Sequence, residues 1–263
     1  MLAVFLVFLV AASSWLFIQR RWWLPEQASI HSADIDRVFL VTLIITGVLF
    51  ILLQGILAYF AFRYSEQRSE RARYWIRPGL EKRFALIAGI IIFGVDVTIF
   101  ALGESQWFKA WGPSPTGTPV VEVMGEQFAW NFRYPGPDGV FGKTDSALIS
   151  SSNPFGIDKT DPSNADDIVS INQLHLPENK PVRLRLRSHD VIHSFFLPYQ
   201  RVKQDAVPGM QIELWFVPNR AGQYEIACSQ LCGLGHYRMQ AQLTVEPQEA
   251  FDKWLREAAN GGI

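Results

Sequence analysis

Two long apolar runs dominate the first 104 residues of the chain. Val38–Phe62 holds 25 residues without a formal charge, and Phe84–Gly103 is a second run interrupted only by Asp96. As a helix, the first run spans about 37 Å, enough to cross a hydrocarbon core of about 30 Å. The pattern therefore predicts a transmembrane helical hairpin over residues 38–104.

The segment between the runs, residues 63–83, carries seven Lys or Arg residues against three acids. Short loops rich in Lys and Arg remain on the cytoplasmic side of a membrane. We therefore expect this loop in the cytoplasm and everything after residue 104 on the opposite side.

A third apolar stretch occupies the N-terminal segment, residues 1–24. A signal peptide normally has a basic n-region, which is missing here, although Ala11–Ser14 would serve as a weak cleavage region. An extra transmembrane helix and a signal peptide both stay open, and the missing charge favours the retained helix.

Beyond residue 118 the apolar positions alternate with polar ones. Val182–Arg187 alternates aliphatic and basic side chains, and in Gln211–Phe216 an apolar side chain recurs at every second position. Turns rich in Pro and Gly separate such runs, as they separate the strands of a sandwich. Residues 105–247 are therefore predicted to form an antiparallel β-sandwich or barrel, and residues 248–263 to form a helix.

Residues 141–167 form a stretch rich in Ser, Asn, Asp, Gly and Pro, without periodicity. The stretch is too long for a hairpin loop and predicts a surface insertion. The insertion would be either a docking surface for a partner or a solvent-exposed loop without a binding role. The formal net charge of the chain is -1, so there is no basic footprint for nucleic acid.

Candidate chemistry is concentrated in the twelve residues from Cys228 to Met239. Cys228, Cys232, His236 and Met239 are soft or borderline ligands, which favour copper in its electron-transfer states over magnesium, calcium or a hydrolytic zinc. A one-copper blue site uses a single cysteine. The second thiolate therefore predicts two copper ions bridged by two thiolates.

Each copper then needs an imidazole. His193, which follows the alternating run at residues 182–187, is the candidate, and His189 is its competitor. Either could instead be an ordinary surface histidine. Zinc and a disulfide are the rival uses of the cysteines, but the paired CxxC and HxxxH halves of a Cys2His2 zinc site are not found at this spacing.

Three motifs carry a family resemblance: Asp190–Phe195, Lys203–Gly209 and the segment Cys228–Met239. From Val38 onward, the chain resembles subunit II of the haem–copper cytochrome c oxidases. The resemblance implies an α+β membrane protein, in which a two-helix hairpin precedes an outer domain of cupredoxin type that holds a binuclear copper centre called CuA.

The resemblance also implies a ligand set made of five side chains and one backbone carbonyl. Cys228 and Cys232 would bridge both coppers, His193 and Met239 would complete one copper, and His236 with the carbonyl of Gln230 would complete the other.

The function implied is that of an electron-transfer subunit in a proton-pumping cytochrome c oxidase. Cytochrome c, or a tethered c-type cytochrome, would be the donor. Subunit I would receive the electrons at its haem and carry out the oxygen chemistry, with subunit III as a further partner. The long 141–167 insertion resembles a bacterial branch, so we expect a multi-pass protein of the bacterial plasma membrane with its copper domain on the periplasmic or extracellular side.

Three positions raise separate questions. Gln230 stands where many members have a Glu that also serves a magnesium site shared with subunit I, and an amide oxygen would bind magnesium more weakly. In the family, an aromatic patch that accepts electrons usually begins with a Trp, and Phe128 stands at that position here. Phe128 or Trp130 would then receive the electrons, or both side chains would only contribute to packing. Glu81 resembles the acid that opens a proton channel, or it is a carboxylate placed at a helix start by the helix dipole.

Two other functions compete with this interpretation. A membrane-anchored copper-binding or copper-delivery cupredoxin would need exposed, exchangeable ligands. A quinol oxidase subunit II would keep the fold without the copper ligands, all of which are present here.

Overall fold

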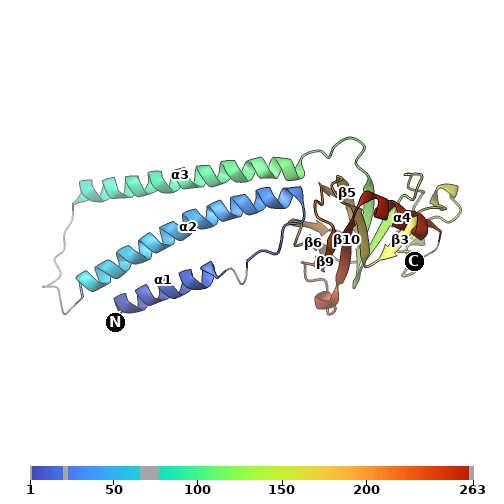
Figure 1. Cartoon of the computed structure of the whole chain (residues 1–263). Helices are drawn as coiled ribbons and strands as arrows, with labels where there is room; N and C mark the ends of the chain where they lie inside the picture. Colours follow the sequence, from blue (N-terminus) through green and yellow to red (C-terminus); the bar gives the residue numbers. More distant parts are fainter. Residues whose placement is uncertain (1, 20–22, 66–76, 261–263) are drawn as a thin grey trace. The chain divides into compact units, whose positions relative to one another are not determined.

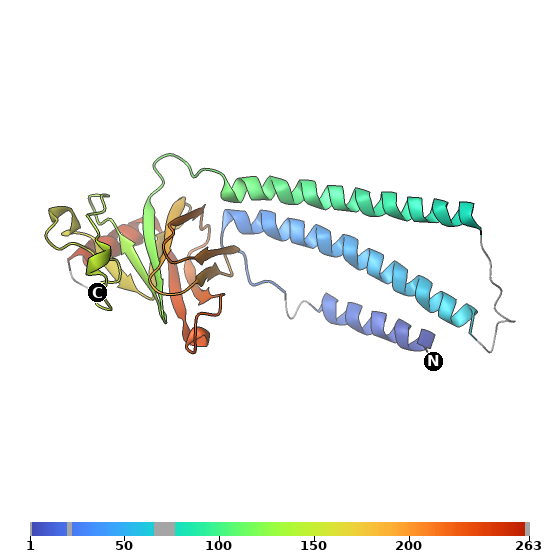
Figure 2. The same cartoon turned by 180° about the vertical axis from the view of Figure 1, so that it is seen from behind.

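The computed structural model describes residues 2–19, 23–65 and 77–260. Its contacts divide the chain into two compact units, one of residues 1–23 and 36–106 and the other of residues 24–35 and 107–263. The first unit is helical, and the second is a β-sandwich (Figures 1 and 2).

The helices of the N-terminal region are α1 (Leu2–Ile18), α2 (Ile30–Arg63) and α3 (Pro78–Trp111). Two of them, α2 and α3, are long and apolar enough to cross a membrane. Each has 34 residues, which is about 51 Å of helix. Both predicted spans are therefore confirmed as helices, and α1 is a shorter apolar helix. Residues 66–76 of the predicted cytoplasmic loop lie outside the described residues.

The described part of the second unit has ten strands in two sheets. The first sheet, in the order β3-β2-β1-β5-β8, comprises β1 (Val120–Glu126), β2 (Ala129–Tyr134), β3 (Ile168–Ile171), β5 (Val182–Ser188) and β8 (Ile212–Phe216). The second, in the order β4-β10-β9-β6-β7, comprises β4 (Gln173–Pro177), β6 (His193–Leu197), β7 (Val202–Ala206), β9 (Gly222–Cys228) and β10 (Gln240–Glu246). The prediction of a sandwich is confirmed.

Both sheets are mixed, so the prediction of an antiparallel sandwich was only partly right. β1 pairs in parallel with β5, and β10 pairs in parallel with β4. The chain leaves β1 through β2 and returns to its other side only after the insertion, β3 and β4. Side-chain alternation has the same period of two in parallel and antiparallel ladders, so it predicts strands but not their direction.

The core lies between the two sheets. Val182, Leu184 and Leu186 of β5 are buried, and the arginines between them are partly exposed, as the alternation predicted. Trp130 of β2 and Phe195 of β6 meet edge to face in the same core, with ring centroids 5.1 Å apart. Each large apolar side chain contributes about 1.5–3 kcal/mol when buried, which fixes the register of the strands that carry the loops.

Two further segments attach to the sandwich. The predicted C-terminal helix is present as α4 (Gln248–Ala259), and its Trp254 stacks on His175 of β4 with ring centroids 4.1 Å apart. Residues 25–37 were left unassigned by the sequence. In the structure, Ser29 forms a β-bridge with Pro218, which helps to attach residues 24–35 to the β unit.

A buried arginine ties the 141–167 insertion to the first sheet. Arg133 of β2 is 1% exposed, and its guanidinium donates to Glu122 of β1 at 2.9 Å and to Asp167 at 3.0 Å. It also donates to Asn164 at 2.9 Å and to a backbone carbonyl of the insertion at 2.7 Å. Arg133 therefore donates hydrogen bonds both to strand β1 and to the 141–167 insertion.

Replacing Arg133 with Met should destabilise the β unit by about 3–5 kcal/mol, because the change leaves Asp167 as a buried carboxylate without its cation. Urea unfolding of the purified protein measures this free energy. Lys253→Met is the matched control, since Lys253 makes an exposed ion pair with Glu257, and such pairs contribute little. Equal stability of the two variants would contradict the role given to Arg133.

Candidate metal centre

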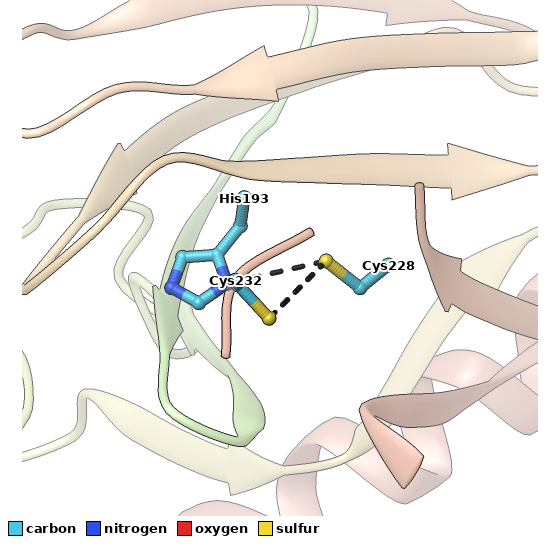
Figure 3. A group of neighbouring side chains, drawn as sticks. All are labelled: His193, Cys228 and Cys232. Atoms are coloured by element: carbon cyan, nitrogen blue, oxygen red, sulfur yellow. Dashed lines mark hydrogen bonds between the residues drawn. The ribbon is translucent and has the colours of Figure 1, made fainter. Parts of the chain in front are cut away.

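Strand pairing brings together the two segments that carry the candidate ligands. His193 is the first residue of β6, and Cys228 is the last residue of β9. These strands are antiparallel neighbours with Phe195 opposite Cys228, so His193 lies at the same end of the sheet as the loop that follows Cys228. We call residues 228–239 the ligand loop. Figure 3 shows His193, Cys228 and Cys232 converging at this end.

The donor atoms predicted from the sequence converge in one small region. The sulfur of Cys228 lies 3.9 Å from that of Cys232, 4.0 Å from Nδ1 of His193 and 3.2 Å from the carbonyl oxygen of Gln230. The sulfur of Cys232 lies 3.7 Å from both Nδ1 of His236 and Sδ of Met239. Both cysteines are free thiols, so they do not form the alternative disulfide.

The chemistry of this donor set fits copper. Two thiols lie at the centre, an imidazole nitrogen faces each of them, and a thioether and a carbonyl complete the group. His193, Cys232 and Met239 are buried, which keeps water away from three of the six donors. Thiolate, imidazole and thioether donors together are typical of copper sites in electron-transfer proteins.

The two thiols differ in their readiness to ionise. Burial opposes ionisation of Cys228, but the His193 ring and backbone contacts outweigh it and lower the pKa of this thiol to about 6. Burial and the neighbouring Cys228 charge raise the pKa of Cys232 to about 11. Near neutral pH and without metal, Cys228 is therefore a thiolate and Cys232 is a thiol. A copper site in which both sulfurs are thiolates would require Cys232 to lose its proton.

Two residues that were not predicted as site residues position the predicted ligands. Asp190 accepts from Nε2 of His193 at 2.8 Å with one carboxylate oxygen and from the backbone N–H of Gln127 at 2.8 Å with the other. The side-chain amide of Gln127 in turn donates to the carbonyl of Cys232 at 2.5 Å. Asp190 thereby orients the ring of His193 so that Nδ1 faces the sulfur.

Comparisons with known proteins show which family the chain belongs to. Residues 119–245 match the family model described as "Cytochrome C oxidase subunit II, periplasmic domain". The alternative cytochrome c oxidase subunit 2 of Bradyrhizobium diazoefficiens is 34% identical over 271 residues, which cover 98% of this chain and 92% of that protein. The chain belongs to the cytochrome c oxidase subunit II family.

Other relatives carry the same description. The cytochrome c oxidase subunit 2 of Thermostichus vulcanus is 28% identical over 285 residues, covering 89% of this chain and 78% of that protein. Among solved structures, the periplasmic domain of oxidase subunit II (CoxB) of Bradyrhizobium japonicum matches with a TM-score of 0.42 and 28% identity, covering 57% of this chain and 99% of that one. This subunit II is thus a membrane protein of an oxidase complex that has subunit I as a partner, and its family implies copper of the CuA type.

The aromatic residues singled out in this subunit II have different environments. Trp130 is fully buried, and its ring meets that of His193 edge to face with centroids 5.8 Å apart. It therefore presents no surface to an electron donor, and that part of the prediction needs correction. Phe128 is half-buried and lies against the ligand loop at Gly233 and Gly235.

The remaining candidates lie away from the thiols. Nδ1 of His189 lies 3.7 Å from Glu126, so this competitor of His193 faces a carboxylate. Glu81 lies in the first turn of α3 and accepts from the backbone N–H of Arg77 at 3.4 Å. This contact accounts for the position of Glu81 at a helix start and leaves its proton role as a prediction.

The pKa difference predicts selective alkylation of metal-free subunit II. As the pH rises through about 6, Cys228 should become reactive, and at pH 7 about nine-tenths of it should be thiolate. Cys232, with a pKa of about 11 and little exposure, should remain almost unmodified. Iodoacetamide labelling followed by peptide mass spectrometry measures both sites. Equal labelling of the two cysteines between pH 6 and 7 would refute this assignment.

Replacing Asp190 with Asn should weaken copper binding about 10- to 100-fold, because the neutral amide no longer supports the charge on the His193 ring. Competition with a copper chelator measures the affinity. Asp138→Asn serves as the control, since Asp138 caps the backbone N–H of Val140 in an exposed turn. An unchanged affinity in the Asp190 variant would show that the carboxylate does not position the ligand.

Proposed function

We propose that this subunit II accepts electrons from a c-type cytochrome at a binuclear copper centre and delivers them to haem in subunit I. The observation that carries the proposal is the pair of free thiols 3.9 Å apart, with an imidazole nitrogen facing each sulfur. One thiol would suffice for a mononuclear copper site, so the second points to two ions.

The residues that would hold the copper are those that converge in the fold. Cys228 and Cys232 would bridge both ions, His193 and Met239 would complete one, and His236 with the carbonyl of Gln230 would complete the other. When bound, such a pair supplies a one-electron carrier whose charge is shared between two metal ions.

The protein supplies a rigid and dry setting for that carrier. His193 is held by Asp190, and Asp190 is held by the backbone N–H of Gln127. Trp130 packs beside the His193 ring, and Phe195 in turn packs against Trp130 in the core. A donor set fixed in this way moves little when the charge at the site changes, so little reorganisation accompanies electron transfer.

Several finer assignments follow from the same proposal. The donor is cytochrome c or a tethered c-type cytochrome, and subunit III accompanies subunit I in the complex. The protein is a multi-pass protein of the bacterial plasma membrane with the β unit on the periplasmic or extracellular side. Phe128 contributes to the surface that receives electrons, Glu81 opens a proton path, and the side chain of Gln230, exposed in this chain, contributes to a weak magnesium site shared with subunit I.

The competing function of copper delivery is disfavoured by burial. Proteins that hand copper to a partner need ligands that the partner can reach. Here Met239 is 1% exposed and Cys232 is 4% exposed, and the predicted ligands come from a β-strand and a braced loop. Such an arrangement favours permanent binding.

The proposal predicts that the purified oxidase holds two more copper ions per complex than the oxidase with a Cys232→Ser variant of this chain. A serine hydroxyl does not ionise near neutral pH and is a poor bridging ligand for copper. Metal analysis and the rate of cytochrome c oxidation measure the two consequences, and both should fall. Ser229→Ala, a change in the same loop that removes no proposed ligand, is the control. Full copper content in the Cys232 variant would contradict the bridging role.

A further inference from the structure

Helix α3 carries one carboxylate in the middle of its membrane span. Asp96 lies 13 residues after Arg83 and 11 residues before Trp107, and the run from Phe84 to Gly103 contains no other charge. Because α3 is one continuous helix (Figure 1), these separations correspond to about 20 Å and about 16 Å. Basic and tryptophan side chains are typical of the two edges of a membrane span. Asp96 therefore lies near the middle of a hydrocarbon core of about 30 Å.

Asp96 has no partner within the part of the chain that the structure describes. Its side chain is exposed, and it makes no hydrogen bond or ion pair with a described residue. Neither α1 nor the charge-free run Val38–Phe62 of α2 contains a Lys, Arg or His residue. The side chains one turn away on α3 are all apolar, namely Ile92, Phe93, Ile99 and Phe100. A charged side chain at this depth is costly unless it is paired, and the described helices do not supply the counter-charge.

The face of α3 that carries Asp96 has a glycine on each side of the carboxylate. Gly89 and Gly103 lie seven residues before and after Asp96, which places all three residues on one face of the helix. A Cβ atom on either glycine would meet nothing within 4 Å, so no other described segment packs at these positions. Glycines allow the backbone of a second helix to approach closely. A carboxylate between two such positions therefore suits a neighbouring transmembrane helix.

We propose that Asp96 forms an ion pair inside the membrane with a Lys, Arg or His side chain on a transmembrane helix of subunit I, and that this pair holds the two subunits together. Subunit I is a partner of this chain in the oxidase complex. A second copy of the chain would present the same carboxylate and no cation in its described spans, so it does not meet the requirement. The ion pair is separate from the copper ligands and does not rest on the proposed function.

Substitutions of Asp96 in the complete oxidase complex test the pair. Asp96→Leu leaves the cation of subunit I buried and unpaired, so subunit I should dissociate from this chain about 100-fold faster in detergent solution. Asp96→Asn keeps a polar side chain of similar size without the charge, and dissociation should be about tenfold faster. Asp96→Glu keeps the charge, and its rate should stay close to that of the wild-type complex. The amount of subunit I that remains with the tagged chain over time measures each rate.

Thr98→Val is the matched control for these variants. Thr98 lies two residues further along α3, on the opposite face, and its hydroxyl donates to the backbone carbonyl of Gly94 at 2.8 Å. Its removal takes a polar group from nearly the same depth without changing the Asp96 face, so the dissociation rate should not change. None of the substitutions makes α3 less apolar, so the amount of chain in the membrane should stay the same in every variant.

A photo-crosslinking group in place of Ile92, one turn from Asp96 on the same face, identifies the partner. Peptide mass spectrometry should find it attached to a transmembrane peptide of subunit I that contains a Lys, Arg or His residue. The same group at Thr98, on the opposite face, should not attach to that peptide. Attachment of the group at Ile92 to a different subunit, to a second copy of this chain or to a peptide without a basic residue would overturn the proposal.

Two results of the dissociation measurement would also overturn it. If Asp96→Leu behaves like Thr98→Val, the carboxylate does not hold subunit I. If Asp96→Asn matches the wild-type complex while Asp96→Leu releases subunit I, the contact is a neutral hydrogen bond and the partner carries no cation.

Discussion

The antiparallel pairing of β6 with β9 is the constraint on which the candidate centre depends. It places Phe195 opposite Cys228, and thereby brings His193 to the sulfur of a residue 35 positions later in the chain. A slip of one residue would turn the His193 side chain from the core to the other face of the sheet. The buried aromatic residues on β2 and β6 oppose such a slip. The packing of the sandwich core therefore also determines the geometry of the donor set.

The carboxylate of Asp190 provides a second connection between distant segments at the candidate centre. Asp190 connects the His193 ring to the backbone N–H of Gln127, and the side chain of Gln127 connects to the carbonyl of Cys232. Three segments far apart in sequence are thereby joined at one end of the sandwich. Leu231 and Leu234 of the ligand loop are exposed and take no part in this network.

How far the sequence predicts this structure depends on how local each signal is. The membrane helices were predicted because a run such as Val38–Phe62 carries its whole signal within itself. The four ligand residues within the ligand loop were likewise visible as a local motif. For Trp130, core packing and electron entry were both left open, since an aromatic residue in an alternating strand fits either face, and its burial favours packing. The roles of Asp190 and Gln127 rest on a contact between residues 63 positions apart, although the position of Asp190 three residues before His193 was a signal that could have been used.

Electron paramagnetic resonance of the oxidised, copper-loaded β unit tests the central claim most directly. One unpaired electron shared equally by two coppers couples to both nuclei, so the account predicts a seven-line hyperfine pattern and a purple protein. A four-line spectrum from a single copper, or a protein that binds only zinc at this site, would contradict the assignment of a binuclear copper centre to Cys228 and Cys232.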